Sequence, residues 1–319
     1  MIILFALLVL LIIVLLLARY TYHEAFYSPP QKRASPFDPI SGEQYVAVSD
    51  RILSASKKLD AIQFEEVWIT SKDGLRLYGR YYHLADGAPL QILFHGYRSC
   101  ALRDCSGGYL LAHKLGFNVL IVDQRAHGKS GGHTITFGIK ERFDCLCWVE
   151  YACSRFGTEA PIVLSGLSMG AATVLMATEL DLPDNVVCVI ADSPYSAPSD
   201  IIRKVCLDRR YPVKPAYLFL ALGALVFGKF NMEQCSAAEA VKYSRLPILL
   251  LHGEDDRLVP YQMSRYIQSV SASYTILETF PNSGHGLCYV IDPSRYEKVV
   301  SAFLKSVPAL GVFLKDISD

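Results

Sequence analysis

A serine between two glycines stands in the middle of the chain, where an apolar run meets a run of helix-forming residues. Residues 166–170, GLSMG, match the pattern G-x-S-x-G, a sharp strand-to-helix turn that holds a serine in a strained conformation with its hydroxyl exposed. The glycines avoid clashes across the turn, and Ala171 and Ala172 let the helix pack close to the strand. Ser168 could instead serve only as a helix N-cap, but the glycines and the preceding apolar run favour a nucleophile.

A serine hydroxyl attacks a carbonyl only when a base removes its proton, so a histidine and an orienting carboxylate are expected on later strand ends. The run LPILLLHGEDDRLVP predicts a strand followed by a loop that carries Glu254, Asp255 and Asp256. The run YTILETFPNSGHGLCY predicts a last strand followed by a loop that carries His285. We expect His285, which lies between glycines, to reach Ser168, although a loop histidine can also be merely solvated.

Attack on a carbonyl also needs two backbone N–H groups that point at the developing negative charge. Met169, directly after the serine, is expected to supply one of them. The loop after the first parallel strand, LFHGYRSC, is expected to supply the other from Tyr97. His95 and His127 each precede a glycine after a strand, and we expect them to brace loops rather than to act in chemistry.

The elements that hold these residues are short apolar runs that alternate with helix-length segments. Continuous apolarity indicates strands buried on both faces, and the alternation indicates right-handed crossovers and a mostly parallel sheet. In such sheets, sites form at the carboxyl ends of the strands. An earlier stretch, FEEVWITSKDGLRLYGRYYH, predicts an antiparallel hairpin. The apolar runs are PLQILFHG, FNVLIVD, APIVLSG, NVVCVIAD and PILLLHG.

Six segments together resemble the α/β-hydrolase superfamily, and in particular the membrane-anchored serine hydrolases often labelled alpha/beta hydrolase domain proteins. The similarity of segment order runs from about residue 65 to 304, and the segments are LFHGYRSC, VDQRAHGKSGG, SGLSMGAATVLM, ADSPYS, HGEDDRLVP and GHG. The resemblance implies an α/β-hydrolase fold, a mostly parallel central sheet flanked by helices. It also implies Ser168 as nucleophile, His285 as general base and then acid, and Asp256 as the carboxylate that fixes the imidazole.

One departure from the family pattern lies in a structural loop. The more usual D-x-R-G-H-G-x-S has Ala126 in place of its first glycine here, which leaves the implied catalytic residues untouched. The resemblance does not identify the substrate, because the same three residues serve esterases, lipases, thioesterases, amidases and peptidases.

The first residues of the chain predict a single-pass membrane anchor, residues 1–22. The run from Ile2 to Ala18 is uninterrupted apolar sequence, about 26 Å long as a helix, and aromatic residues follow it as an interfacial belt would. A cleaved signal peptide is the alternative, but no Lys or Arg precedes the run. Arg19, Lys32 and Arg33 follow it, which predicts a catalytic domain on the cytoplasmic side.

The rest of the chain divides into a tether, residues 23–60, and an α/β-hydrolase domain, residues 61–310. An insertion at about 197–242 is expected to form a small helical cap over Ser168 and to set specificity. Within it, residues 216–228 carry no charge and predict a buried, lid or interfacial helix. A basic cluster precedes that helix and would either lie against anionic lipid or be simply solvated. It comprises Arg203, Lys204, Arg209, Arg210 and Lys214.

Composition excludes several other functions. The formal net charge is zero and no long basic run is present, so nucleic acid is not an expected partner. The nine cysteines are odd in number and lack paired metal-ligand spacing, so we expect no disulfide framework, no metal and no cofactor, and a reducing compartment.

The sequence therefore predicts a serine hydrolase that cleaves carboxylic esters through an acyl-enzyme intermediate and favours apolar acyl chains. Its expected partners are a small-molecule or lipid-like ester and the membrane. A peptidase or amidase of the same fold is the closest alternative, and a membrane scaffold without activity is a more distant one.

Overall fold

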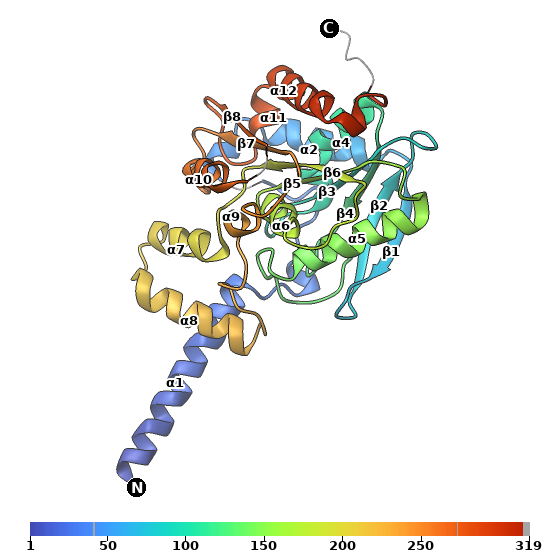
Figure 1. Cartoon of the computed structure of the whole chain (residues 1–319). Coiled ribbons are helices and arrows are strands. Elements are labelled where there is room, and N and C mark those ends of the chain that lie inside the picture. The colour runs from blue at the N-terminus through green and yellow to red at the C-terminus, as the bar shows by residue number, and fades with distance from the viewer. Residues whose placement is uncertain (41, 273, 315–319) are drawn as a thin grey trace.

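An eight-stranded sheet forms the centre of the domain (Figure 1). The computed structural model describes residues 1–40, 42–272 and 274–314. The strand order is β1-β2-β4-β3-β5-β6-β7-β8. The first two pairings, β1 with β2 and β2 with β4, are antiparallel and the others are parallel, which confirms the hairpin and the mostly parallel sheet. The strands are β1 (Glu65–Thr70), β2 (Arg76–Tyr82), β3 (Leu90–Phe94), β4 (Asn118–Val122), β5 (Ile162–Leu167), β6 (Val186–Asp192), β7 (Ile248–Gly253) and β8 (Thr275–Phe280).

Helices cover both faces of this sheet (Figure 1). Every residue of β3, β4 and β7 is buried, as expected for strands between two helical layers. One apolar cluster joins the sheet to α5 and α6, and a second joins its other face to α2, α4 and α12. The helices in these layers are α2 (Ser49–Asp60), α3 (Ala101–Asp104), α4 (Ser106–Leu115), α5 (Glu141–Phe156), α6 (Met169–Ala177), α10 (Gln262–Val270), α11 (Cys288–Ile291) and α12 (Pro293–Ser306).

The predicted insertion forms helices, but its longest helix packs beside the N-terminal helix. The insertion contains α7 (Pro198–Asp208), α8 (Val213–Val226) and α9 (Ala237–Ala240). Helix α8 crosses the end of α1 (Ile2–Ala25) so closely that a Cβ on Gly223 would lie 2.4 Å from the Ala18 carbonyl oxygen. The Thr21 hydroxyl also donates to the Phe219 carbonyl oxygen at 2.9 Å. These contacts place α8 against α1.

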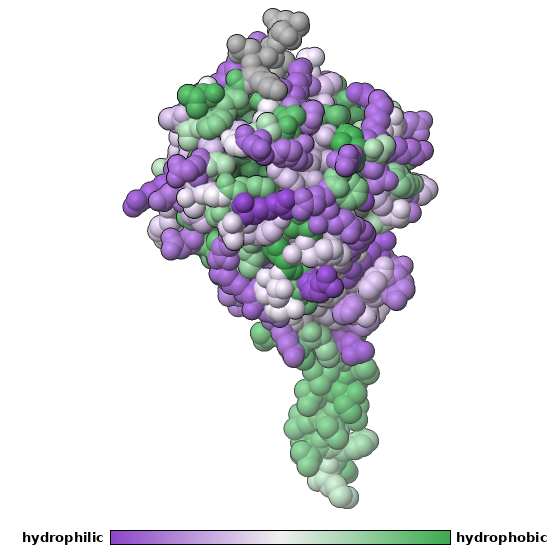
Figure 2. All heavy atoms as spheres, turned by 90° about the vertical axis from the view of Figure 1, so that its right-hand side faces the viewer, coloured by the Kyte–Doolittle hydropathy of each residue, from purple (hydrophilic) through white to green (hydrophobic). Residues whose placement is uncertain are grey.

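Helix α1 projects from the domain as an apolar stalk (Figure 2). Among the described residues it is the one helix long and apolar enough to cross a membrane. Nearly all the side chains from Ile2 to Leu17 are exposed, whereas Ala18 and Tyr22 are buried. The helix therefore has an exposed outer part and an inner end that belongs to the domain.

The segment predicted as a tether differs from a free linker, because it packs along the domain. Phe26 is fully buried, and the Ser28 hydroxyl donates to the Ala126 carbonyl oxygen at 2.8 Å. The Arg33 guanidinium donates to the backbone carbonyls of residues 128, 130 and 132. It thereby provides hydrogen-bond donors for carbonyl groups of a loop that lies outside the strands. Helix α2 then covers one face of the sheet. We call residues 26–60 the N-terminal arm.

Candidate active site

Ser168 occupies a strained turn between β5 and α6. Its φ of 56° and ψ of −113° lie in a region that residues with a side chain rarely adopt. Helix α6 starts directly after it and lies so close to β3 that a Cβ on Gly170 would come within 2.1 Å of the Phe94 carbonyl oxygen. The Ser168 N–H is held by the Asp192 carbonyl oxygen at 2.8 Å. This packing keeps the serine at the carboxyl edge of the sheet, as its pattern predicts.

Three of the predicted site residues form a continuous hydrogen-bonded chain. His285 Nε2 lies 2.8 Å from Ser168 Oγ, and His285 Nδ1 lies 2.7 Å from Asp256 Oδ2. A carboxylate accepts hydrogen bonds and does not donate them. Nδ1 therefore carries the proton that Asp256 accepts, and Nε2 is left free to accept the Ser168 hydroxyl proton. All three side chains are buried.

Asp256 is held from several directions and stays ionised. Its Oδ1 accepts the backbone N–H groups of Leu258 and Val259 at 2.9 and 2.8 Å. Burial alone would raise the pKa of this carboxyl, but hydrogen bonds from His252 and His285 outweigh burial and hold the pKa well below its ordinary value. The neighbours Glu254 and Asp255 are exposed.

His252 is a supporting residue that the sequence analysis does not identify. Its Nε2 lies 3.2 Å from Asp256 Oδ2 and 2.8 Å from the Val259 carbonyl oxygen, which it reaches as a donor. Its Nδ1 lies 2.7 Å from the Ser264 hydroxyl. The sequence contains one signal for this role: His252 is the next to last residue of a buried strand and lies four residues before Asp256.

The loop that carries His285 is fixed by the N-terminal arm. The Gln44 side-chain oxygen accepts the His285 N–H at 3.0 Å, and the Tyr45 hydroxyl donates to the His285 carbonyl oxygen at 3.1 Å. Burial raises the pKa of Tyr45 above its ordinary value, so the phenol remains a donor. No motif marks Gln44 or Tyr45 in the sequence, and both lie in the segment predicted as a tether.

The two predicted oxyanion donors flank the serine on different elements. Met169 begins α6 directly after Ser168. The other loop approaches closely, since a Cβ on Gly96 would lie 3.4 Å from Ser168 Cβ. The Gly96 N–H donates to Asp104, whereas within the described part of the chain no hydrogen-bond acceptor is recorded for the N–H groups of Tyr97 and Met169.

His95 and His127 lie in positions that brace loops. His95 Nε2 accepts the Gln124 N–H at 3.0 Å, and its Nδ1 lies 2.8 Å from the Gly96 carbonyl oxygen. His127 Nε2 accepts the Arg98 N–H at 3.0 Å. Burial lowers the pKa of His127 well below its ordinary value, so the ring remains neutral and able to accept this bond.

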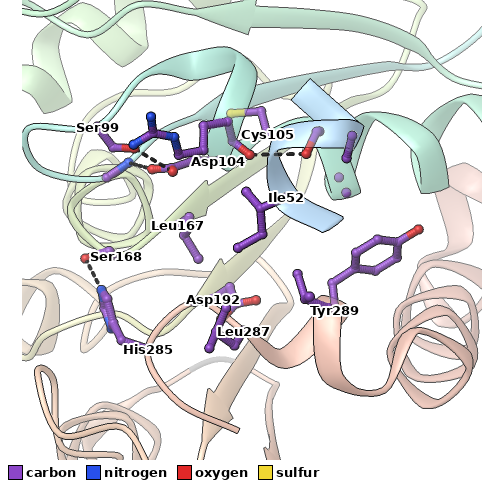
Figure 3. Close-up of a pocket in the computed structure, with 18 of the residues that line it drawn as sticks. Ile52, Ser99, Asp104, Cys105, Leu167, Ser168, Asp192, His285, Leu287 and Tyr289 are labelled. Atoms are coloured by element: carbon purple, nitrogen blue, oxygen red, sulfur yellow. Dashed lines mark hydrogen bonds between the residues drawn. The ribbon is translucent and has the colours of Figure 1, made fainter. Parts of the chain in front are cut away.

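A cavity of about 530 Å³ extends away from the serine (Figure 3). Ser168 and His285 lie at one end, Tyr289 lies at the other, and Ile52 of α2 points into the space between them. Asp192 also lines the cavity, and burial raises the pKa of its carboxyl to about 6.

The lining corrects the expected role of the cap. No residue of the insertion 197–242 lines this cavity, whereas the N-terminal arm contributes several residues to it. The insertion's longest apolar helix, α8, packs on the end of α1 instead. The arm residues that line the cavity are Pro39, Ile40, Tyr45, Arg51, Ile52 and Ala55.

Among the residues that the structure describes, no cluster of three or more His, Cys, Asp or Glu side chains could hold a metal ion. The nine cysteines are free, and all but Cys153 are buried.

Comparisons with known proteins find similarity to hydrolases. A family model described as "Serine aminopeptidase, S33" matches residues 89–234, a range that includes Ser168 and ends before Asp256. The uncharacterised protein YqkD of Bacillus subtilis is 26% identical over 229 residues, which cover 71% of this chain and 75% of that protein. The lysophosphatidylserine lipase ABHD12 of Danio rerio is 26% identical over 166 residues, 51% of this chain but only 42% of that lipase.

Solved structures agree on the fold. The esterase Pf2001 of Pyrococcus furiosus superimposes with a TM-score of 0.67 at 22% identity, and the match covers 88% of this chain and 98% of the esterase. At this identity the similarity concerns the fold, which is the α/β-hydrolase fold.

Proposed function

We propose that this protein, which belongs to the α/β-hydrolase superfamily, is a serine hydrolase that cleaves carboxylic esters through an acyl-enzyme intermediate. The observation that carries the proposal is the chain from Asp256 through His285 to Ser168, with separations of 2.7 and 2.8 Å. A buried, charge-supported imidazole beside a strained serine hydroxyl is the arrangement that makes a serine nucleophilic.

In the proposed reaction, Ser168 Oγ attacks the ester carbonyl carbon while His285 Nε2 takes the hydroxyl proton. The N–H groups of Tyr97 and Met169 stabilise the negative oxygen of the tetrahedral intermediate. His285 then passes its proton to the departing alcohol, which leaves the acyl group on Ser168. Water, deprotonated by the same imidazole, releases the acid. Asp256 keeps the imidazole in one tautomer and stabilises its protonated form.

The cavity offers apolar surface to an acyl chain. Ile52 and Leu287 line the space beyond Ser168 (Figure 3), together with charged residues such as Asp104. An acyl chain placed against the apolar side chains would lose its contact with water. The name of the lysophosphatidylserine lipase supports a lipid-like substrate, and the name of the serine aminopeptidase family supports the peptidase alternative.

A fluorophosphonate probe and a substrate panel test the proposal. We expect the probe to label the full-length protein and to leave Ser168→Ala unlabelled, because phosphonylation requires the activated hydroxyl. We expect p-nitrophenyl esters to be cleaved and aminoacyl p-nitroanilides to be cleaved far more slowly. Comparable kcat/KM on the anilides would favour a peptidase. Absence of both labelling and hydrolysis would favour a scaffold.

We propose further that α1 anchors the protein in a membrane, with the catalytic domain on the cytoplasmic side. The exposed apolar run of α1, residues 2–17, supports the anchor, because the helix is long and apolar enough to cross a membrane. Helix α8 leaves Leu218, Leu225 and Val226 exposed beside this stalk, as an interfacial helix would. In the basic cluster, Arg203 and Lys204 pair with acidic neighbours, so the exposed residues 209, 210 and 214 are those that could meet anionic lipid.

Removal of residues 2–17 should release a soluble protein that retains ester hydrolysis. A longer deletion through Tyr22 should lower the Tm, because it removes Ala18 and Tyr22 from their packing on the domain. Membrane fractionation, an ester assay and a thermal melt measure these results. The anchor would be disproved if the full-length chain stayed in the soluble fraction, and a mature N-terminus near Ala18 would identify a cleaved signal peptide instead. Protection of the domain from added protease in sealed cells would support the cytoplasmic side.

A further inference from the structure

The inner end of α1 is joined directly to the loop that carries Tyr97. The Tyr97 hydroxyl donates to the Ala25 carbonyl oxygen at 2.7 Å. The Arg98 guanidinium donates to the carbonyl oxygens of Glu24 at 2.8 Å and Tyr27 at 3.2 Å. Two neighbouring loop residues therefore bond to one short stretch of the chain, 24–27, which is 70 or more residues away in sequence.

Two of these three bonds, those to Glu24 and Ala25, use acceptors that the helix itself cannot satisfy. The last four carbonyl groups of an α-helix have no partner inside the helix, and α1 ends at Ala25. A cationic side chain is also favoured at this end, because the helix dipole places partial negative charge there. Tyr97 and Arg98 thus cap the C-terminus of α1 from the side of the active site.

The end of α1 is itself fixed in the domain, so it can serve as a rigid reference. Phe26 is fully buried and packs edge to face against Phe137 and Phe230, with ring centroids 5.7 and 5.3 Å apart. The Tyr97 ring lies 4.9 Å from the same Phe137 ring. The Phe26 carbonyl oxygen accepts the Ile135 N–H at 2.8 Å. A shift of this stretch would therefore disturb the packing around Tyr97 as well.

The loop between these contacts has a conformation that needs support. Arg98 has a φ of 50°, in the left-handed region that residues other than glycine seldom occupy. On its inner side, His127 Nε2 holds the Arg98 N–H at 3.0 Å. On its outer side, the end of α1 holds the side chains of Tyr97 and Arg98. The Tyr97 N–H lies between these two supports and points to no recorded acceptor among the described residues.

We propose that the side chain of Tyr97 is a positioning residue, which uses the end of α1 to aim its own backbone N–H at the oxyanion. The inference rests on the proposed serine hydrolase function. It gives α1 a second role, because the same helix that forms the stalk also fixes one of the two oxyanion donors. Loss of one such donor costs about 10² to 10³ in kcat. If the N–H group is kept but points in a less favourable direction, kcat should fall by less, about tenfold.

The test is Tyr97→Phe in the full-length protein in detergent micelles, compared with Tyr22→Phe. Both substitutions remove one hydroxyl that links α1 to the domain, but the Tyr22 hydroxyl bonds to Thr134 at 2.7 Å, not to the Tyr97 loop. For Tyr97→Phe we expect kcat on p-nitrophenyl acetate to fall about tenfold with KM within about twofold. The Ki of an alkyl boronic acid, which forms a tetrahedral adduct on the serine, should rise by a similar factor. For Tyr22→Phe, both quantities should stay close to wild type.

The outcomes separate this inference from the function on which it rests. Equal kcat losses in the two variants, a change in KM alone, or a boronic acid Ki that does not move would overturn the positioning role. A thermal melt of each variant shows whether the protein is folded, and the Ki is measured on the folded fraction. If Ser168→Ala retained the activity of the wild type, the proposed serine hydrolase function would be refuted, whatever the two tyrosine variants showed.

Discussion

Asp256→Asn should lower kcat/KM for a p-nitrophenyl ester by about 10⁴ while the fold and the Tm stay close to wild type. An amide in place of the carboxylate can keep the backbone bonds from Leu258 and Val259 but offers no negative charge to His285. The imidazole could then present Nε2–H to Ser168, and the protonated imidazole would lose its partner. Steady-state kinetics and a thermal melt measure both expectations.

The neighbouring carboxylates are the matched controls. Asp255 is exposed and makes no recorded side-chain bond to His285, so Asp255→Asn should change kcat/KM by less than about threefold. Asp192 is the other acid near the site, and its Oδ1 accepts the Ser193 hydroxyl at 2.8 Å. If Asp255→Asn or Asp192→Asn reduced turnover more than Asp256→Asn, the assignment of the acid would be refuted.

The pH profile provides a further check on Asp256. Its carboxyl has a folded-state pKa below the ordinary value, so its contribution to stability is present above the unfolded pKa and is lost as pH falls through the folded one. The pH range between the unfolded and the folded pKa of this carboxyl lies well below the pH of an ester assay. Titration of Asp256 should therefore leave no inflection in kcat/KM between about pH 5 and 9.

The central fold and the positions of Ser168, His285 and Asp256 at one edge of the sheet could be predicted because their signals are local. Five of the strands are predicted from short apolar runs that end in Gly or Asp, and a parallel sheet brings such ends to one edge. Ser168 is marked by its glycines, His285 by its place after the last strand, and Asp256 by the family pattern. Each residue is thus placed by the strand next to it and needs no knowledge of distant contacts.

The contacts of the N-terminal arm with the domain could not be predicted because they are long-range. The composition of the arm, rich in Pro, Ser and charge, is typical of a linker. Whether Arg33 finds carbonyl acceptors or Phe26 finds an apolar pocket depends on loops about a hundred residues further along. The same is true of Gln44, which reaches the His285 backbone. Sequence periodicity also cannot show that α8 packs on α1. An apolar helix of 14 residues has the same pattern whether it packs on another helix or covers an active site as a lid.

Acyl chain length should change kcat/KM more than any other property of the substrate. Each methylene that leaves water contributes about 0.8 kcal/mol, close to a fourfold gain in kcat/KM. Across p-nitrophenyl esters from acetate to a medium chain, we expect rates to climb by about 10² to 10³ and then to fall. The fall should come when the chain is longer than the cavity, whose lining extends from Ser168 to Tyr289 (Figure 3).

Ile52→Trp should cut this climb short, because Ile52 points into the cavity between Ser168 and Tyr289 (Figure 3). A larger ring there would leave room for short chains only, so acetate hydrolysis should stay within about threefold of wild type while medium-chain esters lose about 10². The matched control is Leu225→Trp on α8, an exposed position outside the cavity lining. It should leave the whole series unchanged, as expected if the arm and not the insertion binds the acyl chain. A flattened series in Leu225→Trp with a normal one in Ile52→Trp would restore the insertion as the specificity element, and a wild-type preference for acetate would refute the apolar acyl substrate.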